Sequence, residues 1–319
     1  MQALARILVV DFTRYLPGAY ASRELLRLGA RIVRVERPEG DPMRETTPAW
    51  DEVLRAGTES VVCDLKSDVA FARALCRRAD VVLESFRPGV ATRLGIGPAE
   101  VPGSTVYCSI TGFGADGRHA ARAGHDLNYL GWAGALEDTA PGNPPVQAAD
   151  LAAGALGAVV QVLAALLERE RTGIGAHLVI SMTHGSHDLV SHRVGGEPVP
   201  RMLTGGLACY RMYATSDGRH LTVGALEPKF FERLCELLDR PELAERQYAD
   251  DQEALAKELA AILAGRTLAE WLEHFGDEDA CVGPVSTLEE ATPEFGANAR
   301  VEVVPLGAHT EAWRHELGV

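Results

Sequence analysis

The sequence lacks the cysteine and glycine patterns that mark disulfide frameworks, zinc sites and nucleotide loops. Its cysteines form neither a CxxC pair nor a Cys/His spacing typical of zinc, so we expect buried thiols in a reducing compartment and no metal ion. They are Cys63, Cys76, Cys108, Cys209, Cys235 and Cys281. No GxGxxG string follows the first apolar run, which continues DFTRYLPGAYAS, and no P-loop string occurs. Dinucleotide and P-loop nucleotide sites are therefore disfavoured.

Basic residues are also scarce. The chain has 31 Lys and Arg against 45 Asp and Glu, a formal net charge of −14 at pH 7. Because nucleic-acid surfaces need clustered basic residues, no nucleic-acid partner is expected, while a local basic pocket for a phosphorylated small molecule stays open. The apolar stretch at the N-terminus is too short for a signal sequence, and no later segment suggests the roughly 20 apolar residues of a membrane span. We expect a cytoplasmic protein with no membrane partner.

The 319 residues, 46% of them hydrophobic, are enough for a large core and about two domains. Short apolar runs alternate with helical patterns in the first part, which predicts an α/β fold with a parallel sheet covered by helices on both faces. The predicted strands are residues 7–12, 31–36, 60–65, 80–86 and 104–113, with helices at 21–28 and 67–78. Ligands of such sheets bind beyond the carboxyl ends of the strands. The loops at Arg37, 86–89 and 112–114 are therefore of interest.

The second part begins with a strand at residues 176–182 and a histidine-rich stretch containing His184, His187 and His192. Its Gly, Pro and Ser content is typical of a linker, and it has no partner at metal-ligand spacing. A hairpin at 210–226 and helices at 228–263 and 267–275 follow. The sequence therefore predicts a large domain at 1–183, a linker at 184–204 and a small α+β domain at 205–303. A C-terminal tail at 304–319 is expected to return to the large domain.

His125 and Asp150 are the candidate acid–base residues. His125 lies in GHDLNYL, and Asp150 immediately precedes a long Ala/Leu/Val segment of helical character, where a carboxylate is expected to cap the helix. A capping Asp or a lone loop histidine is more often structural than catalytic. Glu227 in VGALEPKFF is a third candidate, although an isolated Glu is normally a solvated surface group.

Several strings resemble, in this order, the class III CoA-transferase family of CaiB/BaiF type: GARIVRVERPEGD, SVVCDLKS, VLESFRPGV, SITGFGADG, GHDLNYL, TSDGRHLTVGALEPKFF and DACVGPVSTLEEA. The GHDLNY and VGALEPKFF strings are most similar to its α-methylacyl-CoA racemase branch. The resemblance implies a Rossmann-like large domain that binds CoA, a small domain, and an interlocked homodimer. It implies no cofactor other than the CoA of the substrate.

The same resemblance assigns catalytic roles to His125 and Asp150 and has Glu227 hydrogen-bond the histidine, with the interlocked dimer leaving open that Glu227 acts from the other chain. The implied CoA contacts are Arg37, the backbone of Val62, Cys63, Asp64 and Leu65, Arg87, Arg93, Gly124, Asp126, Leu127, Asn128 and Tyr129. The chain departs from the family where many members have Lys and Arg, since it has Thr58 and Glu59. A carrier other than CoA therefore stays open, as does compensation by Arg55.

The expected function is that of an isomerase, a racemase or epimerase of 2-methylacyl-CoA thioesters. Inversion next to a thioester carbonyl needs one group to remove the α proton and another to return a proton on the opposite face. Backbone N–H groups at the start of the Asp150 helix or in the Gly124 loop are candidates for stabilising the enolate. Two alternatives remain: a CoA-transferase that forms an aspartyl-CoA intermediate on Asp150, and a non-catalytic module that binds acyl thioesters.

Overall fold

The computed structural model describes residues 2–296 and 300–319. The described chain forms two compact units, one containing residues up to 192 together with residues from 300 onward, and the other containing residues 193–296. Helix α8 (Met182–Val190) belongs to the first unit, so the segment predicted as a linker at 184–204 is helical in its first part. This helix packs against α6 (Asp126–Trp132), which explains why polar residues such as His187 are ordered there.

The first unit is built on a six-stranded sheet with the order β3-β2-β1-β4-β5-β6. All neighbouring strands in it are parallel. The strands are β1 (Leu8–Asp11), β2 (Arg31–Glu36), β3 (Glu59–Val62), β4 (Val81–Glu84), β5 (Val106–Thr111) and β6 (His177–Ser181). This order is that of the Rossmann fold, which confirms the predicted α/β class and places a topological switch point between β1 and β4.

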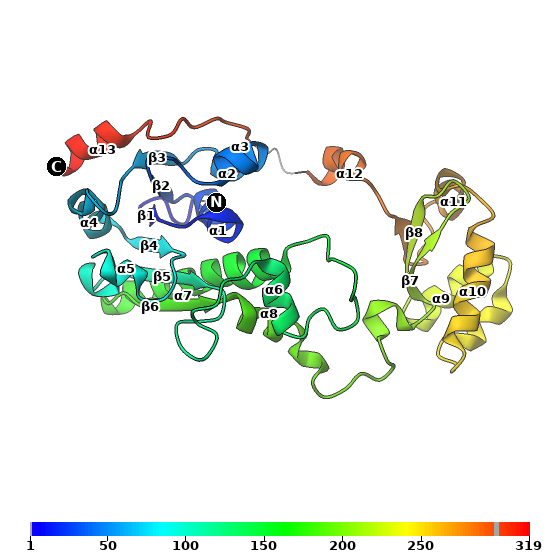
Figure 1. Ribbon diagram of the computed structural model, residues 1–319. Helices are drawn as coiled ribbons and strands as arrows, with labels where there is room; N and C mark the ends of the chain where they lie inside the picture. The colour runs from blue at the N-terminus through cyan, green and yellow to red at the C-terminus, as the bar shows by residue number, and fades with distance from the viewer. Residues whose placement is uncertain (1, 297–299) are drawn as a thin grey trace. The chain divides into compact units, whose positions relative to one another are not determined.

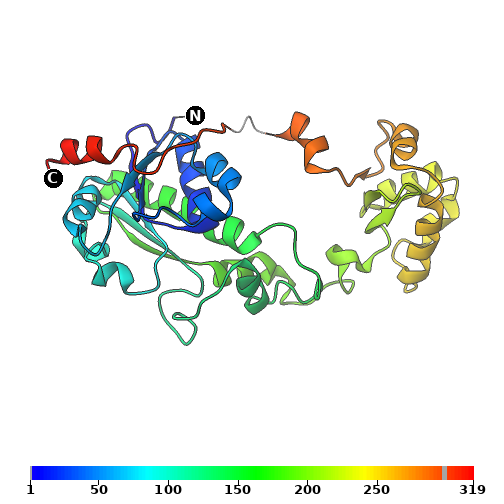
Figure 2. The same cartoon turned by 45° about the horizontal axis from the view of Figure 1, so that its top comes forward.

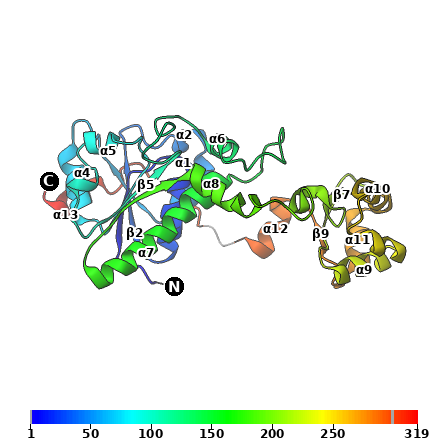
Figure 3. The same cartoon turned by 90° about the horizontal axis from the view of Figure 1, so that it is seen from below.

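Successive residues of the strands face opposite sides of the sheet, and both sides are apolar. Val9 and Ile32 pack with helices α1 (Tyr15–Arg27) and α7 (Gly157–Thr172), whereas Val10 and Val33 pack with α4 (Val69–Arg78) (Figures 1 and 3). The other helices of this unit are α2 (Met43–Thr46), α3 (Pro48–Arg55), α5 (Val90–Arg93), η1 (Pro98–Glu100), π-helical η2 (Ala149–Leu156) and α13 (Thr310–Leu317). Helix η3 (Ser191–Arg193) spans the boundary between the two units.

Helices η2 and α7 form one continuous helix, Ala149–Thr172, which is long and apolar enough to cross a membrane by length and composition alone. The expectation that no segment reaches this length was therefore wrong. The helix lies along the sheet in Figure 3, and its residues Val162 and Leu166 are buried in the core. A core helix passes the same test of length and composition, so this single helix is weak support for a membrane span.

The C-terminal segment lies along β3, the edge strand of the sheet (Figures 1 and 2). The N–H of Ser60 donates to His309 Nδ1 at 3.1 Å, and the N–H of His309 donates to the Ser60 carbonyl at 2.9 Å. The Val62 N–H donates to Thr310 Oγ1, and Trp313 is buried. These bonds satisfy polar backbone groups that an exposed edge strand would leave free for another chain.

The second unit contains a three-stranded antiparallel sheet in the order β7-β8-β9. Its strands are β7 (Tyr210–Ala214), β8 (His220–Gly224) and β9 (Val282–Pro284). The predicted hairpin turns at Gly218, whose φ of +76° suits glycine. The helices are η4 (Met202–Gly206), α9 (Pro228–Leu237), η5 (Pro241–Arg246), α10 (Gln252–Leu263), α11 (Leu268–Phe275) and α12 (Leu288–Phe295). Phe231, Trp271 and Phe275 are buried in a separate core, as expected for a small α+β unit.

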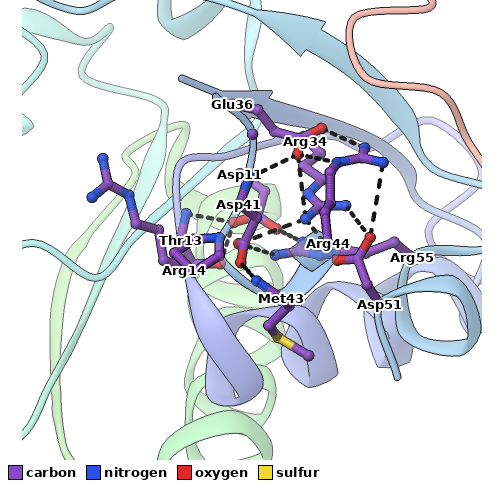
Figure 4. A network of polar contacts seen from close by, with 12 residues as sticks. Asp11, Thr13, Arg14, Arg34, Glu36, Asp41, Met43, Arg44, Asp51 and Arg55 are labelled. Carbon is purple, nitrogen blue, oxygen red and sulfur yellow. Dashed lines mark hydrogen bonds and ion pairs between the residues drawn. The ribbon is translucent and has the colours of Figure 1, made fainter. Parts of the chain in front are cut away.

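A buried ion cluster lies where β1 and β2 end (Figure 4). Its members are Asp11, Arg34, Glu36, Asp41, Arg44, Asp51 and Arg55. Arg34 binds both carboxylate oxygens of Asp51, at 3.0 and 2.7 Å, and Arg44 binds both oxygens of Glu36, at 2.6 and 2.7 Å. Arg55, only 2% exposed, pairs with Asp11. The cluster therefore fixes α2 and α3 against the strand ends.

Arg55→Ala should lower the free energy of unfolding by about 3–5 kcal/mol, because it leaves the Asp11 carboxylate buried without its charge partner. Arg27→Ala is the control, since Arg27 forms an exposed pair with Glu24 and should cost no more than about 0.5 kcal/mol. Urea denaturation of both variants measures the difference. Equal midpoints would show that the cluster does not stabilise the first unit.

Candidate active site

A large cavity of about 650 Å³ opens beyond the carboxyl ends of β1 to β4, where the fold predicts a ligand. Four of the predicted CoA contacts line it: Arg37, Cys63, Asp64 and Leu65. Val62 lies at the end of β3, and its N–H donates to Thr310 Oγ1 while the Cys63 N–H donates to the Glu36 carbonyl. These two N–H groups are thus used within the fold, and the contact of this backbone with CoA stays a prediction.

The sequence reasoning missed two basic residues of this cavity, Arg14 and Lys66. Lys66 follows the end of β3 and Arg14 follows the end of β1, so the rule that ligands bind at the carboxyl ends of strands could have found both. Arg14, Arg37 and Lys66 supply positive charge that phosphate groups would need, in a cavity that Glu39 and Asp64 also line.

Thr58 and Glu59, where the sequence departs from the family pattern, line neither the large cavity nor the cavity that contains His125 and Asp150. Thr58 is buried, and its hydroxyl donates to the Arg55 carbonyl. Glu59 binds Arg31 and accepts a hydrogen bond from Trp313 Nε1 at 2.7 Å. Arg55 belongs to the buried ion cluster and does not line the large cavity, so its guanidinium is used within the fold. Glu59 does not line the large cavity, so its carboxylate would not directly contact a phosphate bound there.

A second cavity of about 290 Å³ contains both His125 and Asp150 among its lining residues. Arg14 and Phe86 line the two cavities alike, so the second one adjoins the large one. Three further lining residues were predicted from the sequence: Arg87, Gly124 and Tyr129. Lining residues that were not predicted include Tyr15, Ser85, Ile110, Arg122 and Met182.

A hydrogen bond between the starts of two helices, α6 and η2, brings His125 and Asp150 to the same cavity. The N–H of Asp150 donates to Oδ1 of Asp126 at 2.9 Å, across 24 positions of the chain. Asp126 is buried, and its carboxylate makes this contact within the fold, while its contact with CoA stays a prediction. His125 precedes α6, and its own N–H donates to Asn128 Oδ1 at 3.0 Å. Tyr129 donates its hydroxyl to the Gly124 carbonyl, which fixes the loop from the other side.

Asp150 does not cap its helix as expected. Helix η2 begins at Ala149 after Ala148, so Asp150 lies inside the first turn, where the helix dipole favours its negative charge. Burial works in the opposite direction and, with a smaller contribution from the charge of Asp126, raises the pKa of Asp150 to about 7. Near neutral pH the carboxyl group therefore exists in both protonation states, which suits a group that gives and takes protons.

Tyr129 is buried and lines the same cavity as this carboxyl group. Burial and, to a lesser degree, the charge of Asp150 raise the pKa of Tyr129 to about 12. Its hydroxyl is therefore neutral at physiological pH and remains a donor to the Gly124 carbonyl.

The remaining predicted residues are in different settings. Leu127 and Asn128 are exposed on α6, and Arg93 is exposed at the end of α5. Glu227 is exposed in the second unit, directly before α9. Its hydrogen bond to His125 stays a prediction. In the described part of the chain, no group of three or more His, Cys, Asp or Glu side chains is placed to hold a metal ion.

Tyr15 and Arg122 were not identified from the sequence although both line the second cavity. Arg122 is three residues before His125, and proximity in sequence could have indicated it. Tyr15 gave no such signal, because its position depends on a turn with a backbone conformation unusual for tyrosine.

The fold is a Rossmann-type sheet with adjoining cavities at its switch point, which is typical of α/β proteins that bind a ligand. The raised pKa of Asp150 in one of these cavities is typical of a group that transfers protons. Comparison with known proteins gives the particular family. The chain belongs to CoA-transferase family III, whose profile matches residues 4–316. It is thus an enzyme of the family that acts on acyl-CoA, and the resemblance seen in the sequence is confirmed.

Named relatives include both reaction types. The α-methylacyl-CoA racemase of Homo sapiens is 37% identical over 310 residues, covering 90% of this chain and 79% of the racemase. The succinyl-CoA:glutarate CoA-transferase of Homo sapiens is 28% identical over 326 residues, covering 92% of this chain and 74% of that enzyme. A CAIB/BAIF family protein from Brucella suis has a crystal structure similar to this one, with a TM-score of 0.83, 25% identity and 98% coverage of both chains.

The raised pKa of Asp150 predicts how stability depends on pH. The folded state binds the Asp150 proton more tightly than the unfolded state, so this contribution is fully present below about pH 4 and is lost as pH rises through about 7. Asp150→Asn should therefore gain roughly 1–3 kcal/mol over the wild type between pH 5 and pH 8, measured by urea denaturation at each pH. Asp188→Asn, at an exposed carboxyl group on α8, is the control and should show no such gain. Parallel pH profiles for wild type and Asp150→Asn would contradict the shift.

Proposed function

We propose that the protein is a racemase or epimerase of 2-methylacyl-CoA thioesters, with His125 and Asp150 as the two proton-transfer groups. The observation that carries this proposal is that an imidazole and a carboxyl group, distant in sequence, line one cavity beside the large one. The racemase relatives support the same reaction, at 37% and 34% identity.

The reaction needs two groups in opposite protonation states on the two faces of the α carbon. In one direction a neutral His125 removes the α proton and the protonated Asp150 returns a proton to the other face; in the reverse direction the ionised Asp150 is the base. A carboxyl pKa of about 7 makes both forms of Asp150 available at neutral pH. Little free energy is therefore needed to bring Asp150 into the protonation state that each direction of the reaction requires.

The enolate formed in between carries its charge on the thioester oxygen and needs hydrogen-bond donors. The start of the Asp150 helix is a poor source, because the Asp150 N–H donates to Asp126 and the Leu151 N–H donates to the Gln147 carbonyl. The N–H groups of Asp126 and Leu127, at the start of α6, donate to no acceptor within the described residues. We therefore assign enolate stabilisation to the His125 loop rather than to the Asp150 helix.

A CoA-transferase is the alternative, and the relative that transfers CoA between succinate and glutarate motivates it. In that reaction the Asp150 carboxylate attacks the thioester carbonyl and expels CoA as a thiolate, which leaves a mixed anhydride of Asp150 and the acyl group. The CoA thiolate then attacks the aspartyl carbonyl of this anhydride, which releases the acyl group as its carboxylate and leaves an aspartyl-CoA thioester. A nucleophile works best when ionised, so the raised pKa of Asp150 favours proton transfer over this role. Hydroxylamine traps an aspartyl-CoA thioester and separates the two reactions.

We further propose that two copies form the interlocked dimer of the family. Apolar side chains are exposed on the first unit at Trp132, Val160 and Leu167, with 52, 62 and 68% of their surface accessible. Such exposure is typical of surfaces that a partner covers. Glu227 would reach His125 from the partner chain and fix the tautomer of its imidazole.

Wild-type protein incubated with (2R)- or (2S)-2-methylacyl-CoA in D₂O should incorporate deuterium at the α carbon. His125→Ala and Asp150→Asn should each lower the exchange rate at least about 100-fold, the usual contribution of a positioned acid or base. Glu168→Gln, on the exposed side of α7, should exchange like the wild type. Mass spectrometry measures the label. Absence of exchange in folded wild type together with an adduct from hydroxylamine would favour the transferase, and binding without either reaction would favour the acyl-thioester module.

Co-expression of His125→Ala and Glu227→Gln chains tests the dimer. If Glu227 acts across the interface, a mixed dimer has one site with both changes and one with neither, so random assembly should restore about a quarter of the wild-type exchange rate. If Glu227 acts within its own chain, every site carries one change and no activity returns. Light scattering confirms that the mixed protein is dimeric before the rate is measured.

A further inference from the structure

Tyr15 has a backbone conformation that a bulky side chain seldom adopts. Its φ is +63°, in the left-handed region where the Cβ of an L-residue is crowded. The other non-glycine residues with positive φ in the described chain are Arg201, Asp239 and Cys281. Strained backbone of this kind persists only where surrounding contacts enforce it, and it is frequent at functional sites.

The contacts that enforce it come from the residues on either side. The buried carboxylate of Asp11 accepts hydrogen bonds from the N–H of Thr13 at 2.8 Å and from the Ser22 hydroxyl at 2.6 Å. Arg55 pairs with the same carboxylate, so the buried ion cluster sets the start of the turn (Figure 4). On the far side of Thr13, the Arg14 N–H donates to Ser85 Oγ at 3.1 Å, which links the turn to the end of β4.

Helix α1 closes the turn from the other end. Gly18 packs so tightly on Thr13 that a Cβ at that position would lie 1.8 Å from Thr13 Oγ1. The chain therefore has little freedom between Asp11 and Gly18, and Tyr15 takes the left-handed conformation that this path requires. A glycine at position 15 would meet the same requirement without steric cost.

The side chain of Tyr15 faces the candidate active site. It lines the same cavity as His125 and Asp150. Its ring stands edge-on to the His125 imidazole, with 6.1 Å between ring centroids and an angle of 87° between planes. The residue is 47% exposed, and its hydroxyl has no hydrogen-bond partner in the part of the chain described here. The ring therefore occupies space beside the catalytic imidazole without being part of the core.

We infer that Tyr15 is a specificity-determining residue that contacts the acyl group and limits its width next to His125. This inference rests on the proposed function for the identity of the reacting carbon, but it concerns binding as well as turnover. Because the ring fills the cavity beside the imidazole, the site accepts slim 2-methylacyl chains and excludes acyl groups that carry a ring on the α carbon.

The test compares Tyr15→Gly and Tyr15→Phe with the wild type, using 2-methylbutanoyl-CoA as the slim ligand and 2-phenylpropanoyl-CoA as the wide one. Calorimetric titration gives the ratio of the two dissociation constants. Tyr15→Gly should shift this ratio at least about 10-fold toward the wide ligand, the effect of opening space in an apolar pocket. Tyr15→Phe should keep the wild-type ratio, because it keeps the ring.

Thermal unfolding separates this role from a structural one. Tyr15→Gly should melt at or above the wild-type temperature because it relieves the left-handed strain. Asp239→Gly is the matched control, since Asp239 has a φ of +56° directly after α9 in the second unit, and it should leave the selectivity ratio unchanged. A Tyr15→Gly protein that melts well below wild type with unchanged selectivity would overturn the inference.

Deuterium exchange run on the same samples distinguishes the two proposals. Loss of selectivity in Tyr15→Gly without exchange in any protein would support the role of Tyr15 and reject the racemase. Exchange by the wild type with identical selectivity in Tyr15→Gly would reject the role of Tyr15 and leave the racemase intact.

Discussion

The hydrogen bond from the Asp150 N–H to the Asp126 carboxylate is the contact on which the candidate active site depends. It joins the loop that carries His125 to the first turn of the long helix, so that the imidazole and the carboxyl group line one cavity. The same buried carboxylate also adds to the effect of burial on the pKa of Asp150. The Asp126 side chain thus helps to hold Asp150 near His125 and also helps to raise the pKa of Asp150. Both effects favour an acid–base pair that works at neutral pH.

The rest of the first unit supports this arrangement. The parallel sheet directs the loops after β1 to β5 to one edge, and the buried ion cluster fixes the ends of β1 and β2 beside the large cavity. The turn that this cluster holds at Asp11 continues into Tyr15, so charge pairing in the interior helps to determine the position of a ring beside His125. With the role proposed for Tyr15, this one turn connects the stability of the first unit with the selection of substrate.

Much of the fold could be predicted from the sequence because its signals are local. Apolar runs such as residues 31–36 match β2 residue for residue, and Gly218 marked the hairpin turn. The site was less accessible, because its geometry arises from contacts between distant segments. Helical propensity suggested that Asp150 is a cap, whereas Ala149 begins the helix. The family resemblance suggested that Thr58 and Glu59 lie near the CoA phosphates. In the structure, the Glu59 carboxylate accepts a hydrogen bond from Trp313, a residue from the far end of the chain. Tyr15 could not be foreseen, since its backbone conformation is imposed by Asp11 and Gly18.

The most direct test of this account is the titration of the Asp150 carboxyl group itself, followed by carbon-13 NMR in the wild type and in Asp126→Asn. The asparagine keeps an oxygen that accepts the Asp150 N–H but removes the charge. We predict a pKa of about 7 for Asp150 in the wild type and a lower value in the variant, still above the ordinary value for aspartate because burial is the larger cause of the shift. A carboxyl group that titrates near 4 in both proteins, the ordinary value for aspartate, would contradict the account.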